Sequence, residues 1–244
     1  MKKIIHRWKS ALALLTAVCL LGAGLALPAA ADSPYKLPDD LTVSSPAALV
    51  VYLGLTPEQD TVLFEKNADE VRAPAALVRL MVGAYALKLI EENNIDVATA
   101  TGTYEVWMFN SFVAGTGIST ANMDFGETWT IKDLLAASLL QTAGDAAVTL
   151  AATLSSFANV TGLDALTQYT TPRDIYRIMR TVMDYPLFNT LTKKVWSYDI
   201  NPTAKGKPWT LTTGNSMMKP SSPYYYEPMQ FGRTGFTDLA GWCL

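Results

Sequence analysis

Two serine–lysine pairs have a spacing that could support acyl transfer, in which a serine hydroxyl attacks a carbonyl and a lysine one helical turn away removes the proton. They are Ser33–Lys36 and Ser216–Lys219. Each pair would need a helix that presents both side chains on one face. Pro34 lies inside the first pair and Pro220 directly follows the second, which disfavours such a helix. With 13 Ser and 12 Lys in the chain, chance alone gives about 0.6 such pairs. We expect neither pair to be catalytic.

The composition excludes several other kinds of site. His6 is the only histidine and lies within the first ten residues, and the cysteines are Cys19 and Cys243. Ser-His-Asp triads, Cys-His pairs and H-E-x-x-H zinc sites each need a histidine beside the reacting group, so all three are excluded. Two cysteines cannot form a disulfide framework. We expect no metal site and no cofactor.

The first 31 residues have the three parts of a secretory signal peptide. Four basic residues between Lys2 and Lys9 precede an apolar run, Ala11–Leu27, and Ala29–Ala31 provides an A-x-A cleavage site. The run is 17 residues long, and a membrane span needs about 20. Cleavage leaves 22 acidic and 15 of the 19 basic residues, a net charge of −7. We therefore expect a secreted protein that has no transmembrane helix after cleavage and does not bind nucleic acid.

The rest of the sequence, residues 32–244, predicts one α+β domain. Apolar, β-branched segments on either side of a Pro-containing turn predict a hairpin of Ala47–Leu53 with Thr61–Glu65. Pro74 introduces Ala75–Glu92, a helix so apolar that we expect it to be buried on all sides. The other expected elements are helices at Ile131–Gln141, Asp145–Leu154 (with Asp145 as its cap) and Pro172–Met183, short strand-like pieces over 95–130, a loop-rich stretch over 186–230, and one strand over Phe231–Leu244.

Three segments follow one another in the order of known catalytic motifs. Arg72–Met81 looks like an S-x-x-K helix, Leu139–Ala147 like an S-x-N turn, and Gly232–Leu244 like a K-T-G strand. Together they resemble the penicillin-binding D-alanyl-D-alanine carboxypeptidase family of serine peptidases, over nearly all of residues 45–244. The resemblance implies a β-lactamase and transpeptidase-type fold, with an antiparallel sheet and a helical insertion. It also implies, as partner, a peptidoglycan stem peptide ending in D-Ala-D-Ala or a cell-wall enzyme.

The residues that match the family's catalytic positions have been replaced. Ala76 stands at the serine nucleophile, and Arg79 stands at the lysine base. Thr142 stands at the relay serine, and Gly144 at the asparagine that holds the substrate amide. An arginine stays protonated and does not act as a base. Without nucleophile and base the covalent route is closed, so we expect an inactive protein with no intact catalytic residue.

The K-T-G-like strand retains a positive charge. Arg233 stands at the lysine and is followed by Thr234, Gly235, Phe236 and Thr237, which the resemblance implies are substrate-binding residues. Arg233 could bind a terminal carboxylate through its fork of N–H groups, or it could form a surface ion pair. By analogy with the family, the backbone N–H of Phe236 would be an oxyanion donor.

The chain ends directly after the third motif. In the family, two further strands lie between this strand and the N-terminal hairpin, so we expect an incomplete domain in which Phe231–Leu244 has no strand neighbour. Three functions stay open. The first is an exported, cell-wall-associated protein that does not catalyse and binds stem peptides through Arg233. The second is an active serine-type carboxypeptidase, and the third is a gene fragment without function.

Overall fold

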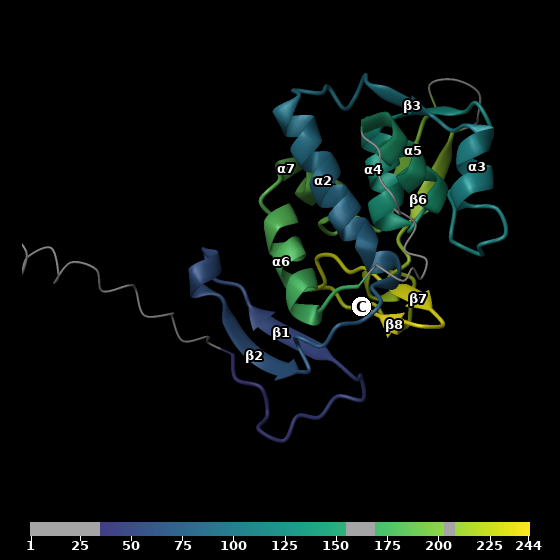
Figure 1. Cartoon of the computed structure of the whole chain (residues 1–244). Helices are drawn as coiled ribbons and strands as arrows, with labels where there is room; N and C mark the ends of the chain where they lie inside the picture. The colour runs from purple at the N-terminus through teal and green to yellow at the C-terminus, as the bar shows by residue number, and fades with distance from the viewer. Residues whose placement is uncertain (1–34, 155–168, 203–207) are drawn as a thin grey trace, which may run out of the picture. The chain divides into compact units, whose positions relative to one another are not determined.

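A computed structural model describes residues 35–154, 169–202 and 208–244, so the expected signal peptide and Ser33 lie outside the described residues. The chain divides into two compact units, Met1–Lys66 and Asn67–Leu244. Figure 1 shows the first as a hairpin and the second as helices joined by short strands. None of the helices in the described ranges combines the length and apolar character that crossing a membrane requires.

The first unit is the hairpin that the sequence predicts. Strand β1 (Ala48–Tyr52) pairs antiparallel with β2 (Thr61–Lys66), with a bulge between Val50 and Val51. The connection contains a short 3₁₀ turn, η1 (Pro57–Gln59). A capping box fixes this turn: the Thr56 side chain pairs with the backbone N–H of Gln59, and the Gln59 side chain accepts a hydrogen bond from the backbone N–H of Thr56.

Four helices form the centre of the second unit. They are α2 (Val78–Glu92), which follows the 3₁₀ turn η2 (Ala75–Leu77), α4 (Ile131–Leu140), α5 (Gly144–Leu154) and α6 (Pro172–Val182). Helix α2 packs against the other three. Its Gly83 allows close approach to α4, because a Cβ there would lie 3.0 Å from Leu139 Cδ2. Leu and Ala are the most frequent residues of the core, which also includes the fully buried Trp129.

The expectation that Ala75–Glu92 is buried on all sides is wrong. Leu80 and Leu87 are each 2% exposed, whereas Met81 and Tyr85 are 48% and 38% exposed. The helix covers the core with one face and presents the other to solvent. Apolar content alone did not reveal this because both faces are apolar.

The remaining elements of this unit are short. Helices α3 (Val106–Phe112) and α7 (Pro186–Thr192), together with the pair β5 (Ser197–Ile200) and β6 (Trp209–Thr212), lie in stretches where the sequence analysis placed strand-like pieces and loops. Strand β3 (Thr101–Thr103) pairs with β4 (Thr128–Thr130) as part of the expected strand-like stretch. All four strand pairs in the described residues are antiparallel, and with the helices they give the expected α+β class.

The expectation that Phe231–Leu244 is one strand without a neighbour is wrong. The segment folds back on itself as a hairpin of β7 (Gly235–Thr237) and β8 (Gly241–Cys243). The turn is possible because Gly241 adopts a φ of 69°, a conformation that glycine accepts without steric cost. Thr237 helps to close the turn, since its Oγ1 accepts a hydrogen bond of 3.1 Å from Ala240 N.

The cap of α4 generates a stability prediction. Thr130 Oγ1 accepts a hydrogen bond of 3.1 Å from Asp133 N at the start of this central helix. We expect Thr130→Ala to lower the free energy of unfolding by about 1 kcal/mol, measured by urea denaturation. Thr130→Ser keeps the hydroxyl and should retain most of the stability. An equal loss in both variants would show that the methyl group, and not the cap, matters.

Candidate functional site

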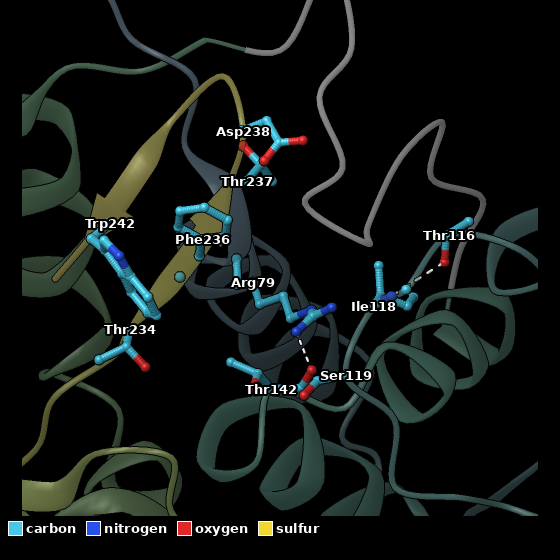
Figure 2. Close-up of a pocket in the computed structure, with 13 residues that line it drawn as sticks. Arg79, Thr116, Ile118, Ser119, Thr142, Thr234, Phe236, Thr237, Asp238 and Trp242 are labelled. Atoms are coloured by element: carbon cyan, nitrogen blue, oxygen red, sulfur yellow. Dashed lines mark hydrogen bonds between the residues drawn. The ribbon is translucent and has the colours of Figure 1, made fainter.

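One pocket in the second unit gathers residues from all three motif segments. Its volume is about 500 Å³. Figure 2 shows its side chains arranged around the guanidinium of Arg79, with the β7–β8 hairpin on one side. The residues that line it are Ala76, Arg79, Thr116, Gly117, Ile118, Ser119, Thr142, Thr234, Gly235, Phe236, Thr237, Asp238 and Trp242.

Ala76 lies in the 3₁₀ turn that precedes α2, and β7 packs directly against it. A Cβ added to Gly235 would lie only 2.8 Å from the backbone N of Ala76 and 3.3 Å from its Cβ. Only glycine permits this approach, which brings the K-T-G-like strand to the start of the helix. The preceding residue, Ala75, is fully buried with a φ of 47°, a strained conformation for a residue with a side chain. The side chain that Ala76 contributes to the pocket lining is a methyl group.

Arg79 lines the pocket from the same side of the helix, three residues after Ala76. The residue is 2% exposed, and its Nη1 donates a hydrogen bond to the carbonyl of Thr142 (Figure 2). Burial lowers the pKa of Arg79 to about 10, and the negative charge of Asp145 opposes that decrease. The side chain is therefore protonated at neutral pH and cannot remove a proton from a hydroxyl.

Thr142 and Gly144 form the tight connection between α4 and α5. Thr142 has a φ of 58°, and its hydroxyl donates to the carbonyl of Gln141. A Cβ on Gly144 would lie 2.3 Å from Ile118 Cδ1 and 3.3 Å from Arg79 Nη2. An asparagine side chain therefore does not fit at this position unless Ile118 moves. Ile118 and Arg79 occupy the space beside Gly144 that a side chain at this position would need.

Asp145 is not the cap of α5 that the sequence analysis expected, because the helix begins one residue earlier, at Gly144. The carboxylate is 1% exposed and accepts hydrogen bonds from the backbone N–H groups of Ala121 (2.8 Å), Met123 (3.0 Å) and Ala146 (2.8 Å). Burial raises the pKa of Asp145, and these hydrogen bonds oppose that rise. The side chain ties the segment behind the pocket to α5.

Arg233 does not lie among the lining residues. It is 4% exposed, and its Nη1 donates a hydrogen bond of 2.5 Å to the carbonyl of Leu139 in the last turn of α4. Burial, and secondarily the positive charge of Arg79, lower its pKa well below the usual value. The expected surface ion pair is therefore wrong. The contact with a terminal carboxylate stays a prediction, and Arg79 is the cation that the pocket presents.

The structure thus unites most of the expected site. Ala76, Arg79, Thr142 and Thr234–Thr237 line one pocket, and Gly144 borders it. The sequence analysis missed the segment Thr116–Ser119, which has no motif, as well as Asp238 and Trp242, which lie inside the matched segment Gly232–Leu244 but were not expected to be site residues. Ser216, in the turn η3 (Ser216–Met218), is not among the lining residues. The described residues contain no cluster of His, Cys, Asp and Glu that could hold a metal ion.

Comparisons with known proteins agree with this geometry. The sequence model of the D-alanyl-D-alanine carboxypeptidase family matches residues 38–156. D-alanyl-D-alanine carboxypeptidase DacF of Bacillus subtilis is 24% identical over 213 residues, which is 77% of this chain and 51% of the relative. The chain thus spans about half the length of this curated relative.

Solved structures show that the fold is shared. A serine-to-alanine mutant of the Streptomyces K15 DD-transpeptidase superposes with a TM-score of 0.66 at 19% identity, covering 84% of this chain and 85% of that chain. A peptidoglycan synthesis regulatory factor, PBP3, from Streptococcus pneumoniae gives 0.68 at 20% identity, covering 83% and 62%. The expected β-lactamase and transpeptidase-type fold is confirmed.

The role of Asp145 generates a second stability prediction. We expect Asp145→Asn to lower the free energy of unfolding by about 3 kcal/mol, since an amide group leaves a buried backbone N–H unpaired and removes the negative charge near Arg79. Thermal and urea denaturation measure this loss. The matched control is Asp124→Asn at an exposed carboxylate nearby, which should change stability by less than about 0.5 kcal/mol. Similar effects of both substitutions would contradict the assigned role.

Proposed function

Because this chain is related to the D-alanyl-D-alanine carboxypeptidases through residues 38–156, we propose that it is an exported, non-catalytic relative that binds peptidoglycan stem peptides. One observation carries the proposal. The three motif segments still build one pocket, although Ala76 offers no nucleophile. A pocket that persists without its chemistry supports binding as the remaining function. Export rests on the signal-like sequence of residues 1–31.

Three features argue against catalysis. The methyl group of Ala76 cannot attack a carbonyl, and Arg79, with a pKa of about 10, holds its proton at neutral pH. The substrate amide also lacks its partner, since Gly144 has no side chain and Ile118 fills the adjacent space. The three features affect nucleophilic attack, proton removal and substrate positioning, so a substitution that restores one of these functions leaves the other two missing.

Two other features support peptide binding. Strand β7 lines the pocket with Gly235, Phe236 and Thr237. An extended peptide that lies along such a strand is a common mode of peptide recognition. The protonated guanidinium of Arg79 lines the same pocket and suits the terminal carboxylate of a stem peptide. A cell-wall enzyme is the alternative partner.

Peptide binding gives the decisive experiment. A fluorescently labelled Lys-D-Ala-D-Ala peptide should bind the purified protein, and its C-terminal amide should bind about tenfold more weakly, because the charge-assisted contact with the carboxylate is lost. Fluorescence anisotropy measures both affinities. Arg79→Met should reduce the affinity for the acid towards that of the amide, whereas Arg79→Lys should retain the preference.

Two results would contradict this assignment. Equal affinities for acid and amide would exclude recognition of the carboxylate. Equal binding of a Lys-L-Ala-L-Ala peptide would exclude a stereospecific stem-peptide site. Arg233→Met, which removes the second positive charge, serves as the comparison for the second cation. If it alone removes the preference for the acid, Arg233 and not Arg79 binds the carboxylate.

Labelling with fluorescent penicillin tests the absence of catalysis. We expect no covalent adduct on the natural chain by mass spectrometry, because acylation needs a nucleophile at position 76. Ala76→Ser combined with Arg79→Lys should give slow acylation, since the new hydroxyl and amine lie three residues apart at the start of the α2 segment. We expect the turnover rate of this double variant to stay about 10²-fold or more below that of an enzyme that holds the substrate amide, because Gly144 has no side chain to hold it.

The single variants are the controls for this experiment. Ala76→Ser alone should remain unmodified, because the arginine does not accept its proton. An adduct on the natural chain would overturn the proposal and favour an active carboxypeptidase. A folded double variant without adduct would show that the obstruction by Ile118 also matters, which Ile118→Ala in the same background would test.

A further inference from the structure

Two exposed aromatic rings form a ledge at the rim of the pocket. Phe236 on β7 and Trp242 on β8 are directly paired across the hairpin, so their side chains share one face. Their ring centroids lie 4.8 Å apart with an interplanar angle of 44°, and both line the pocket. The residues are 51% and 85% exposed. Large rings gathered on a surface beside a pocket are typical of a binding site.

The pocket beside this ledge is lined by hydroxyl groups. Five of its residues carry a side-chain hydroxyl: Thr116, Ser119, Thr142, Thr234 and Thr237. A hydroxyl can both donate and accept hydrogen bonds. The charged lining residues are Arg79 and Asp238, one of each sign. The lining therefore suits a ligand that is itself rich in hydroxyl or amide groups and carries little net charge.

We infer that the Phe236–Trp242 ledge binds an amino-sugar ring of the peptidoglycan glycan, an inference that rests on the proposed function. A pyranose ring has an apolar C–H face, which packs on an aromatic ring, and a rim of hydroxyl and N-acetyl groups, which pair with side-chain hydroxyls. The Phe236–Trp242 ledge supplies the apolar contact, and the hydroxyl groups of the pocket lining supply the hydrogen bonds. Asp238, in the turn between the two strands, is placed to accept hydrogen bonds from ring hydroxyls at the rim (Figure 2).

An apolar partner fits this surface less well. A hydrophobic protein segment, including the hairpin of a second copy, would cover the rings but would also take the exposed carboxylate of Asp238 out of water and offer it no hydrogen bond. Buried polar groups without hydrogen bonds are costly. A sugar satisfies them while it covers the rings, so the mixture of groups favours the sugar.

The test uses a soluble amino-sugar trisaccharide as an analogue of the glycan. The indole N–H signal of Trp242 in a ¹⁵N–¹H spectrum of the purified protein, identified by its loss in Trp242→Phe, should shift saturably on titration with N,N′,N″-triacetylchitotriose. Trp242→Ala should weaken binding about tenfold, and Trp242→Phe should retain most of it because a ring remains. The matched control is Trp107→Ala on α3, an indole that is 52% exposed and not among the pocket-lining residues, which should leave binding unchanged.

The outcomes separate this inference from the proposed function. If the stem peptide binds and the trisaccharide leaves the Trp242 signal in place, the ledge is not a sugar site, although the proposed function stands. If the trisaccharide binds and the peptide does not, the sugar site stands and the peptide proposal falls. Equal losses in Trp242→Ala and Trp107→Ala would overturn the inference. A shift of the Trp242 signal on dilution without sugar would assign the ledge to a second copy and overturn it too.

Discussion

Two buried guanidinium groups are held at the carboxyl end of one helix, and the site is organised around them. Arg233 donates to the carbonyl of Leu139 in the last turn of α4, and Arg79 donates to the carbonyl of Thr142 just beyond it. The end of a helix presents carbonyl groups without intrahelical partners and the negative end of its dipole. Both cations therefore find partial negative charge where an isolated buried charge would be costly. Through these contacts, α4 connects α2 to the segment that leads into β7.

This arrangement explains why the two matched cations have different roles from those that their motif positions suggest. The guanidinium of Arg79 reaches the turn after α4, and Ile118 fills the space that Gly144 leaves open. Arg233 is buried because its guanidinium bonds to a carbonyl at the end of α4, and it does not line the pocket. The replacements fit one another: the arginine contacts a backbone carbonyl, and the glycine leaves room for Ile118. An asparagine introduced at Gly144 in isolation would clash with Ile118.

Sequence reasoning recovered the parts of the fold that local chemistry determines. Pro74 and Pro172 mark helices to within a few residues, and the Pro-containing turn marks the first hairpin. The short helices α3 and α7 were not predicted, because seven residues are too few to show the hydrophobic periodicity of a helix. The order of motifs predicted which segments meet in the pocket. The direction of the Arg233 side chain was not predictable, because it depends on the helix end that tertiary packing brings beside it. The same holds for Trp242, whose place at the rim follows from the turn at Gly241.

The pocket keeps a strained backbone that packing alone can sustain. Ala75 and Thr142 both have positive φ angles, which cost on the order of 1–3 kcal/mol each for residues with a side chain. The strained residue Ala75 lies directly before Ala76, whose side chain is a methyl group. The strain is compensated by contacts on either side, since Gly235 packs on the start of the helix and Arg79 bonds to the carbonyl of Thr142 itself. The shape of the pocket is therefore a property of the packed fold and not of its reactive groups. For that reason a chain can lose nucleophile and base while the surface that recognises a ligand remains.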